Sequence, residues 1–210
     1  MKWLLFPVVP VIALGLCACA DRVADAPATS TVATTSSPAS ASAVAPVVAA
    51  AATPAAMPAP GTIGFSGFGP ARFGDSEEQV RKAWGAELGD ARPEQPGGCY
   101  YLLPQPRSAK GYRIGFMIEQ DRFARVDVDA LDIEAPGGGK VGMSAQDIDR
   151  LYPGRVSKQP HKYVGGGQYL RVADAGGGAA VLLFETDAAG RVSSWRVGVS
   201  PQVEYVEGCS

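Results

Sequence analysis

The chain of 210 residues carries 19 Lys and Arg against 21 Asp and Glu, a formal net charge of −2. Because the charges are balanced and no Lys/Arg-rich run is present, the sequence argues against binding to nucleic acid and leaves any membrane contact to an attached lipid. The sequence contains one histidine and four cysteines, and their spacing matches no metal-binding motif. We therefore expect no metal and no other cofactor.

Residues 1–18 have the features of a lipoprotein signal peptide. A positive start, Met1-Lys2, precedes an apolar run that is short and interrupted by two prolines, as in secretory signals rather than transmembrane helices. The stretch Leu16-Cys17-Ala18-Cys19 resembles a bacterial lipobox. This resemblance implies that Cys19 carries the lipid, palmitate included, and becomes the mature N-terminus. An ordinary signal peptide cut near Ala18 or Ala20 is the alternative.

Residues 19–60 are predicted to form a disordered tether. By resemblance to Gram-negative lipoproteins, Ala20 implies that the protein is not retained in the inner membrane, so we expect anchorage in the outer membrane, facing the periplasm or the cell surface. The segment is almost entirely Ala, Pro, Ser, Thr and Val. Such a composition buries too little surface to offset the entropy of ordering the backbone.

An internal repeat is predicted to organise the remainder into residues 61–136 and residues 137–210. Ser76 and Ser144 are 68 positions apart, and the same offset aligns several neighbouring features. The aligned pairs are Phe73–Val80 with Val141–Ile148, Trp84 with Tyr152, Tyr101-Leu102 with Tyr169-Leu170, and Phe116 with Phe184. We therefore expect an α+β fold of two tandem helix-plus-antiparallel-sheet repeats in one domain. The aligned features are caps and core positions, which favours a protein that is not an enzyme.

Each repeat is predicted to begin with a short helix. Ser76 with Gln79, and Ser144 with Asp147, match a capping box, in which the two side chains satisfy free amides of the first helical turn. Apolar residues at helical spacing follow each cap: Val80, Ala83 and Trp84 in the first copy, and Ile148, Leu151 and Tyr152 in the second.

Apolar residues at alternating positions predict three strands in each repeat. The expected strands are Cys99 to Leu103, Tyr112 to Ile118, Phe123 to Asp129, Gln168 to Ala173, Ala179 to Thr186, and Arg191 to Val199. The expected core residues are Ile114, Phe116, Ile118, Val126 and Val128, then Leu170, Val172, Leu182, Phe184, Trp195 and Val197.

Two cysteines fall outside the signal and tether, Cys99 and Cys209, and an exported protein meets an oxidising compartment. We expect a structural disulfide between them, which would hold the C-terminus in place. The alternative, a redox-active pair, lacks the close Cys-x-x-Cys spacing.

Catalytic groups are few. His161 is interpreted as a loop histidine hydrogen-bonded to the backbone rather than as a metal ligand or a member of a triad, because no Gly-x-Ser-x-Gly motif is present. The pairs Asp127/Asp129 and Asp147/Asp149 could act as acid and base in glycoside hydrolysis, but we interpret them as solvated positions on a strand and a helix.

The sheet face opposite the aliphatic residues is predicted to bind a partner. Six residues of that face belong to the types enriched at binding hot spots: Tyr101, Arg113, Arg125, Tyr169, Arg171 and Arg196. An ordinary polar sheet face is the alternative interpretation.

The stretch from Val141 to Gly154, with Gly-Met-Ser, a short amphipathic helix and Tyr-Pro-Gly, resembles the module of the SmpA/OmlA outer-membrane lipoproteins. A tandem pair of such modules resembles the β-lactamase inhibitory proteins, and the tail Glu207-Gly208-Cys209 is similar to that of other Gram-negative lipoproteins. The resemblance covers roughly residues 67–210, with Asp75 in place of the methionine in the first copy. It implies duplicated helix-plus-sheet modules whose open sheet face binds protein.

We therefore expect a non-enzymatic envelope lipoprotein that binds a protein partner, as an inhibitor, assembly accessory or interaction module. The alternative is a lectin-like lipoprotein that binds carbohydrate such as cell-wall peptidoglycan, with Tyr101 and Tyr169 stacking on sugar rings.

Overall fold

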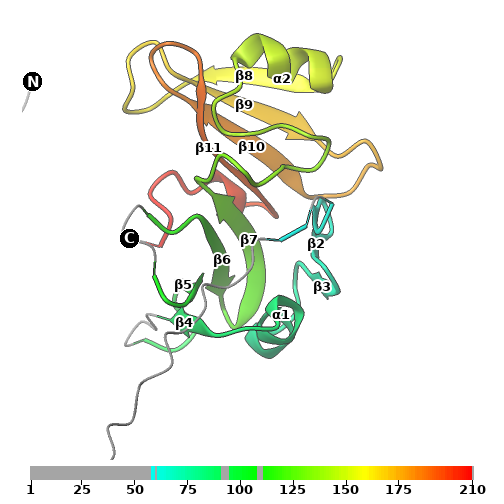
Figure 1. Cartoon of the computed structure of the whole chain (residues 1–210), viewed down its shortest axis with the longest axis vertical. Coiled ribbons are helices and arrows are strands. Elements are labelled where there is room, and N and C mark those ends of the chain that lie inside the picture. The colour runs from blue at the N-terminus through cyan, green and yellow to red at the C-terminus, as the bar shows by residue number, and fades with distance from the viewer. Residues whose placement is uncertain (1–57, 60, 91–94, 108–110, 210) are drawn as a thin grey trace, which may run out of the picture. The chain divides into compact units, whose positions relative to one another are not determined.

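The computed structural model describes residues 58–59, 61–90, 95–107 and 111–209, and the predicted signal peptide, Cys19 and nearly all of the tether lie outside these ranges. The described residues are mostly β-structure (Figure 1). The first sheet contains β1 (Ile63–Gly64), β2 (Gly67–Phe68) and β3 (Ala71–Arg72). The second contains β4 (Leu88–Asp90), β5 (Tyr100–Pro104), β6 (Ile114–Glu119), β7 (Arg122–Val128), β8 (Val156–Pro160), β9 (Gln168–Ala173), β10 (Val181–Thr186) and β11 (Val192–Gly198).

The large sheet is antiparallel and continuous, with strand order β4-β5-β6-β7-β11-β10-β9-β8. Its middle is the pairing of β7 with β11, in which Val126 lies opposite Val197 and Asp127 opposite Arg196. The predicted fold class, two helix-plus-sheet repeats, is therefore wrong: the chain forms one eight-stranded sheet and a separate three-stranded sheet. The physical reason is that a strand edge with free backbone groups is stabilised by pairing, so β7 and β11 join what the sequence suggested were two sheets.

Two short helices begin at the predicted caps. Helix α1 (Glu77–Trp84) follows Ser76 and helix α2 (Ala145–Leu151) follows Ser144, and both caps form the complete reciprocal capping box. Helix α1 ends at Gly85, whose φ of 76° suits a residue without a side chain. Helices of eight and seven residues depend on packing for their stability, and each buries one residue fully, Val80 and Ile148.

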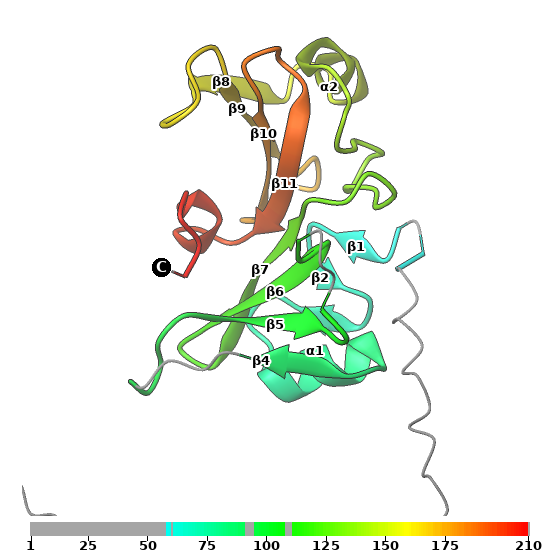
Figure 2. The same ribbon diagram turned by 60° about the vertical axis from the view of Figure 1, so that its left-hand side comes forward.

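One face of the large sheet carries the main core. All eleven core residues that the alternation predicted are buried there, and the core also includes Val80 and Ile148 from the helices and Phe68 from the small sheet. Figures 1 and 2 show both helices and the small sheet on this side. The six predicted strands form as β5, β6, β7, β9, β10 and β11 with ends shifted by at most two residues, whereas β1 to β4 and β8 were missed.

The other face of the large sheet, called here the second face, is covered in part by the C-terminal segment, residues 199–209. This segment includes a 3-10 helix, η1 (Gln202–Glu204), and Figure 2 shows it on the side of the sheet away from β1 and β2. Val203 packs with Tyr169, Val181 and Leu183 in a small second apolar cluster. The predicted disulfide is confirmed: Cys99 and Cys209 are bonded, with their Cα atoms 5.2 Å apart.

Candidate binding cavity

Buried charged residues distinguish the second face from an ordinary polar sheet surface. Arg125 and Asp127 on β7, and Arg196 on β11, are 2%, 7% and 5% exposed. They point to the same side because they alternate with the core residues Val126 and Val197. Burying a charge is costly unless it is paired and hydrogen-bonded, so their partners decide what this face can do.

Arg125 joins the sheet to the C-terminal segment. Its Nε donates to Asp127 Oδ2 at 2.8 Å, and its Nη1 donates to the carbonyl oxygens of Gln202 and Tyr205 at 2.7 and 2.8 Å. Its Nη2 donates to the Tyr101 hydroxyl at 2.6 Å. The guanidinium therefore acts as a buried clamp that holds the C-terminal segment on the sheet.

Space for Arg125 is made by a glycine on the neighbouring strand. Gly198 lies opposite Arg125, and a Cβ on Gly198 would come within 2.5 Å of the Ala124 carbonyl oxygen and 2.9 Å of the Arg125 Cα. Any side chain at this position would force the two strands apart.

A second network surrounds Arg196. Its Nε donates to the Val203 carbonyl oxygen at 2.6 Å, and its Nη1 forms an ion pair with Glu185 on β10. The other Glu185 oxygen lies 3.1 Å from Nε2 of His161. His161 Nδ1 accepts from the backbone amides of Tyr163 and Val164, which confirms the prediction of a loop histidine bonded to the backbone. Because Nδ1 is an acceptor, Nε2 carries the hydrogen that Glu185 accepts.

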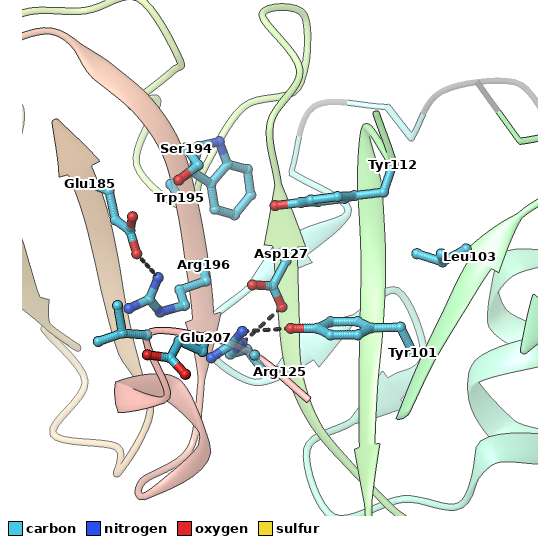
Figure 3. A pocket seen from close by; sticks show the side chains of 12 residues that line it. Tyr101, Leu103, Tyr112, Arg125, Asp127, Glu185, Ser194, Trp195, Arg196 and Glu207 are labelled. Atoms are coloured by element: carbon cyan, nitrogen blue, oxygen red, sulfur yellow. Dashed lines mark hydrogen bonds and ion pairs between the residues drawn. The ribbon is translucent and has the colours of Figure 1, made fainter. Parts of the chain in front are cut away.

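Between these two networks lies an open cavity of about 340 Å³ (Figure 3). The strands contribute Tyr101, Leu103, Tyr112, Arg125, Asp127, Glu185, Ser194, Trp195 and Arg196, and the C-terminal segment contributes Val206, Glu207 and Gly208. Figure 3 shows the side chains of Tyr101 and Tyr112 one above the other and pointing in the same direction, with both hydroxyls directed to the side where Asp127 lies. A smaller hollow of about 100 Å³ adjoins it, because Arg196 and Val206 line both.

Burial and charge perturb the titrating groups of the cavity. The pKa of Tyr101 is raised first by burial and then by the negative charge of Asp127. The pKa of Tyr112 is raised first by burial and then by the charges of Asp127 and Asp129. Burial also raises the pKa of Asp127, and the guanidinium of Arg125 offsets part of that rise. Both tyrosines are therefore neutral hydroxyl groups at physiological pH, able to donate and to accept hydrogen bonds.

The structure separates the six predicted partner-binding residues. Arg125, Arg196 and Tyr169 are buried and make contacts inside the protein, so they are not exposed hot-spot residues. Tyr169 stacks on His161 with 4.5 Å between the ring centroids, which also removes it as a platform for a sugar. Arg125 and Arg196 were expected to be exposed to solvent on the polar face of the sheet. They are buried because the C-terminal segment covers them.

The other three predicted residues keep some exposure. Tyr101 is partly buried and lines the cavity. Arg171 lines the smaller hollow and pairs with Glu204, and Arg113 pairs with Asp132 away from the cavity lining. The structure thus brings Tyr101, Arg125 and Arg196 together and leaves Arg113 outside.

Sequence reasoning missed Asp127, Glu185 and Tyr112 as site residues. Asp127 was expected to be solvated, and this was wrong because Arg125, Tyr101 and the C-terminal segment enclose it. The sequence Arg125-Val126-Asp127 places both charged side chains on the same face of a strand, and this spacing could have indicated that the two residues form an ion pair. Asp147 and Asp149 lie on α2 with side chains 38% and 40% exposed, as expected for a solvated helix face.

The described residues contain no group of three or more His, Cys, Asp or Glu that could hold a metal ion. No helix in the described ranges combines the length and apolarity needed to cross a membrane.

Comparisons with known proteins give little further information. No family model matches the chain, and no curated protein sequence matches it. One solved structure, an extracellular protein containing a SCP domain from Bacillus anthracis str. Ames, matches with a TM-score of 0.39 and 11% sequence identity over 60% of this chain and 44% of that chain. The chain thus spans less than half the length of that protein, and a similarity at this level establishes neither fold nor function. The resemblance to the SmpA/OmlA lipoproteins stays a prediction.

Proposed function

We propose that this chain is a non-enzymatic envelope protein that binds another protein through the second face, at the rim of the 340 Å³ cavity. The observation that supports the proposal is a rigid, open cavity between two buried arginine networks. Arg125 and Arg196 hold the walls by bonds to the backbone of the C-terminal segment. A preorganised pocket with aromatic walls is the type of site where binding energy concentrates, because little order is lost on association.

Site-specific photo-crosslinking in cells tests this proposal. Tyr112 at the cavity mouth is 39% exposed, and Leu151 on α2, at the other side of the sheet, is 40% exposed. A photoreactive residue at position 112 is expected to form a crosslink to one defined envelope protein, and the same residue at position 151 is not. Equal crosslinking from both positions, or none from position 112, would contradict protein binding at this face.

Carbohydrate binding is the second candidate, because two tyrosine rings, Tyr101 and Tyr112, line one cavity. Such rings can stack on the apolar face of a sugar while paired charges bond to its hydroxyls. Sedimentation with purified peptidoglycan separates the two candidates. Strong cosedimentation that Tyr112→Ala removes would favour the glycan, and its absence would favour the protein partner.

We further propose that the chain is a lipoprotein of the outer membrane, anchored only through lipid on Cys19. The support is the lipobox resemblance and the apolar run before it. Metabolic labelling with a palmitate analogue is expected to mark the wild-type chain and not Cys19→Ser. A label that persists in Cys19→Ser would place the lipid elsewhere.

A further inference from the structure

The C-terminal segment is attached to the sheet in two different ways along its length. Its inner part, residues 199–205, is held by buried groups. Arg125 and Arg196 donate to three of its carbonyl oxygens, and Val203 is fully buried in the second apolar cluster. Lifting this part would take acceptors away from two buried guanidinium groups and expose Val203, and both effects are costly.

The outer part, residues 206–209, has weaker contacts. Among the described residues, none of its backbone groups is hydrogen-bonded to the backbone of a strand. Glu207 accepts from Lys162 and Tyr163, but the side chains of Glu207 and Lys162 are 54% and 58% exposed. Ion pairs so exposed contribute little to stability. Val206 is only partly buried against the second apolar cluster.

The disulfide fixes the outer part against the wall of the cavity. Cys99 directly precedes β5, and Tyr101 on that strand lines the cavity. Gly208, next to Cys209, passes close to the same tyrosine, since a Cβ on Gly208 would come within 3.0 Å of the Tyr101 hydroxyl oxygen. Both cysteines are half-buried. The bond is therefore the main attachment of the outer part, and it lies outside the hydrophobic core.

The outer part also separates two hollows of the second face. Val206 and Arg196 line both the cavity of about 340 Å³ and the hollow of about 100 Å³. Glu207 and Gly208 add to the wall of the larger one. Arg196 is held by the inner part, whereas Val206 belongs to the outer part. Removal of the outer part would therefore join the two hollows into one groove.

We propose that residues 206–209 are a strap that the Cys99–Cys209 disulfide holds closed, and that reduction of this bond opens the strap while the rest of the fold persists. The reductant is a dithiol, as carried by thiol–disulfide oxidoreductases. One of its thiolates attacks a sulfur of the bond to give a mixed disulfide, and its second thiol resolves that intermediate. Both cysteines become thiols and the dithiol becomes a disulfide, so the transferred electrons balance.

This inference goes beyond the proposed function and does not depend on it, because it concerns the chain without a partner. Limited digestion of the full chain by a serine carboxypeptidase, with and without dithiothreitol, tests it by intact-mass measurement. The reduced chain is expected to lose residues 206–209 roughly tenfold faster, or more, than the oxidised chain. Trimming is expected to stop before Val203, because the inner part stays on the sheet.

A second measurement distinguishes an open strap from an unfolded chain. In fluorine NMR of the chain labelled with 3-fluorotyrosine, the signal of Tyr101 is expected to shift on reduction, because Gly208 leaves its hydroxyl. The signal of Tyr152, fully buried in the main core, is expected to stay unchanged. Cys209→Ser should give the spectrum of the reduced chain, and dithiothreitol should not alter it further.

Equal trimming of the oxidised and reduced chains would overturn the inference, since the outer part would then be held without the disulfide. Trimming beyond Val203, or loss of the folded signal of Tyr152 on reduction, would overturn it too, because the whole segment or the whole fold would then depend on the bond. Each of these results leaves the proposed function to its own test, the crosslink from position 112.

Discussion

Replacing Arg125 by methionine removes the clamp between the sheet and the C-terminal segment. Arg125 is 2% exposed and donates to Asp127, to Tyr101 and to two carbonyl oxygens of the segment. Breaking a buried ion pair by removing one partner costs about 3–5 kcal/mol, because the remaining charge stays buried without compensation. We expect Arg125→Met to lower the free energy of unfolding by this amount.

The measurement is urea unfolding followed by tryptophan fluorescence, with the disulfide intact. With a slope of about 2 kcal/mol per molar urea, the midpoint is expected to fall by roughly 1.5–2.5 M. Arg150→Met is the control, because Arg150 lies on α2 with its side chain 72% exposed and is expected to matter by less than about 0.5 kcal/mol.

The reasoning is tested most sharply by a double-mutant cycle. In the wild type, Asp127→Asn breaks the pair with Arg125 and should destabilise the protein. In the Arg125→Met background the same change removes a lone buried carboxylate, so it should be neutral or stabilising. A cost below about 1 kcal/mol for Arg125→Met, or an effect of Asp127→Asn that is the same in both backgrounds, would refute this account.

Three further predictions concern stability. The Cys99→Ser/Cys209→Ser double variant removes a disulfide between residues 110 positions apart, so its free energy of unfolding should fall by about 2–5 kcal/mol in a denaturant titration. A loss below about 1 kcal/mol would show that the C-terminal segment is held in place without the disulfide. Gly198→Ala should lower the free energy of unfolding by about 2 kcal/mol or more, because the added Cβ meets backbone atoms. In Gly89→Ala the added Cβ meets only the flexible end of a glutamine, so the loss should be below about 1 kcal/mol. Equal unfolding midpoints for the two variants would contradict the packing described. Hydrogen bonds from Ser144 lower the pKa of Asp147 below its ordinary value of 3.8, so the stabilisation by this carboxylate is present well above pH 3.8 and is lost as pH falls through its folded-state pKa. The difference in unfolding free energy between wild type and Asp147→Asn should therefore shrink on acidification, and a difference that grows would reverse the assigned sign.

Local features of this protein could be predicted from the sequence because their physical causes are local. Ser76 and Ser144 each cap a helix through contacts with a residue three positions away, and the sequence displays both partners. The alternation along β6, β7, β10 and β11 identified the core because successive side chains of a strand point to opposite faces. The Cys99–Cys209 pairing followed from the count of cysteines outside the predicted export signal and tether.

The fold class and the cavity depend on contacts between distant residues, and only the tertiary structure decided them. The pairing of β7 with β11 makes one sheet from strands about 70 residues apart, and no local pattern specifies that pairing. Arg125 meets the carbonyl oxygen of Tyr205 across 80 positions, which buries a charge that its sequence neighbourhood presents as a surface residue. The cavity forms because the C-terminal segment lies across the polar face of the sheet. A terminal segment has no periodicity that reveals where it will lie.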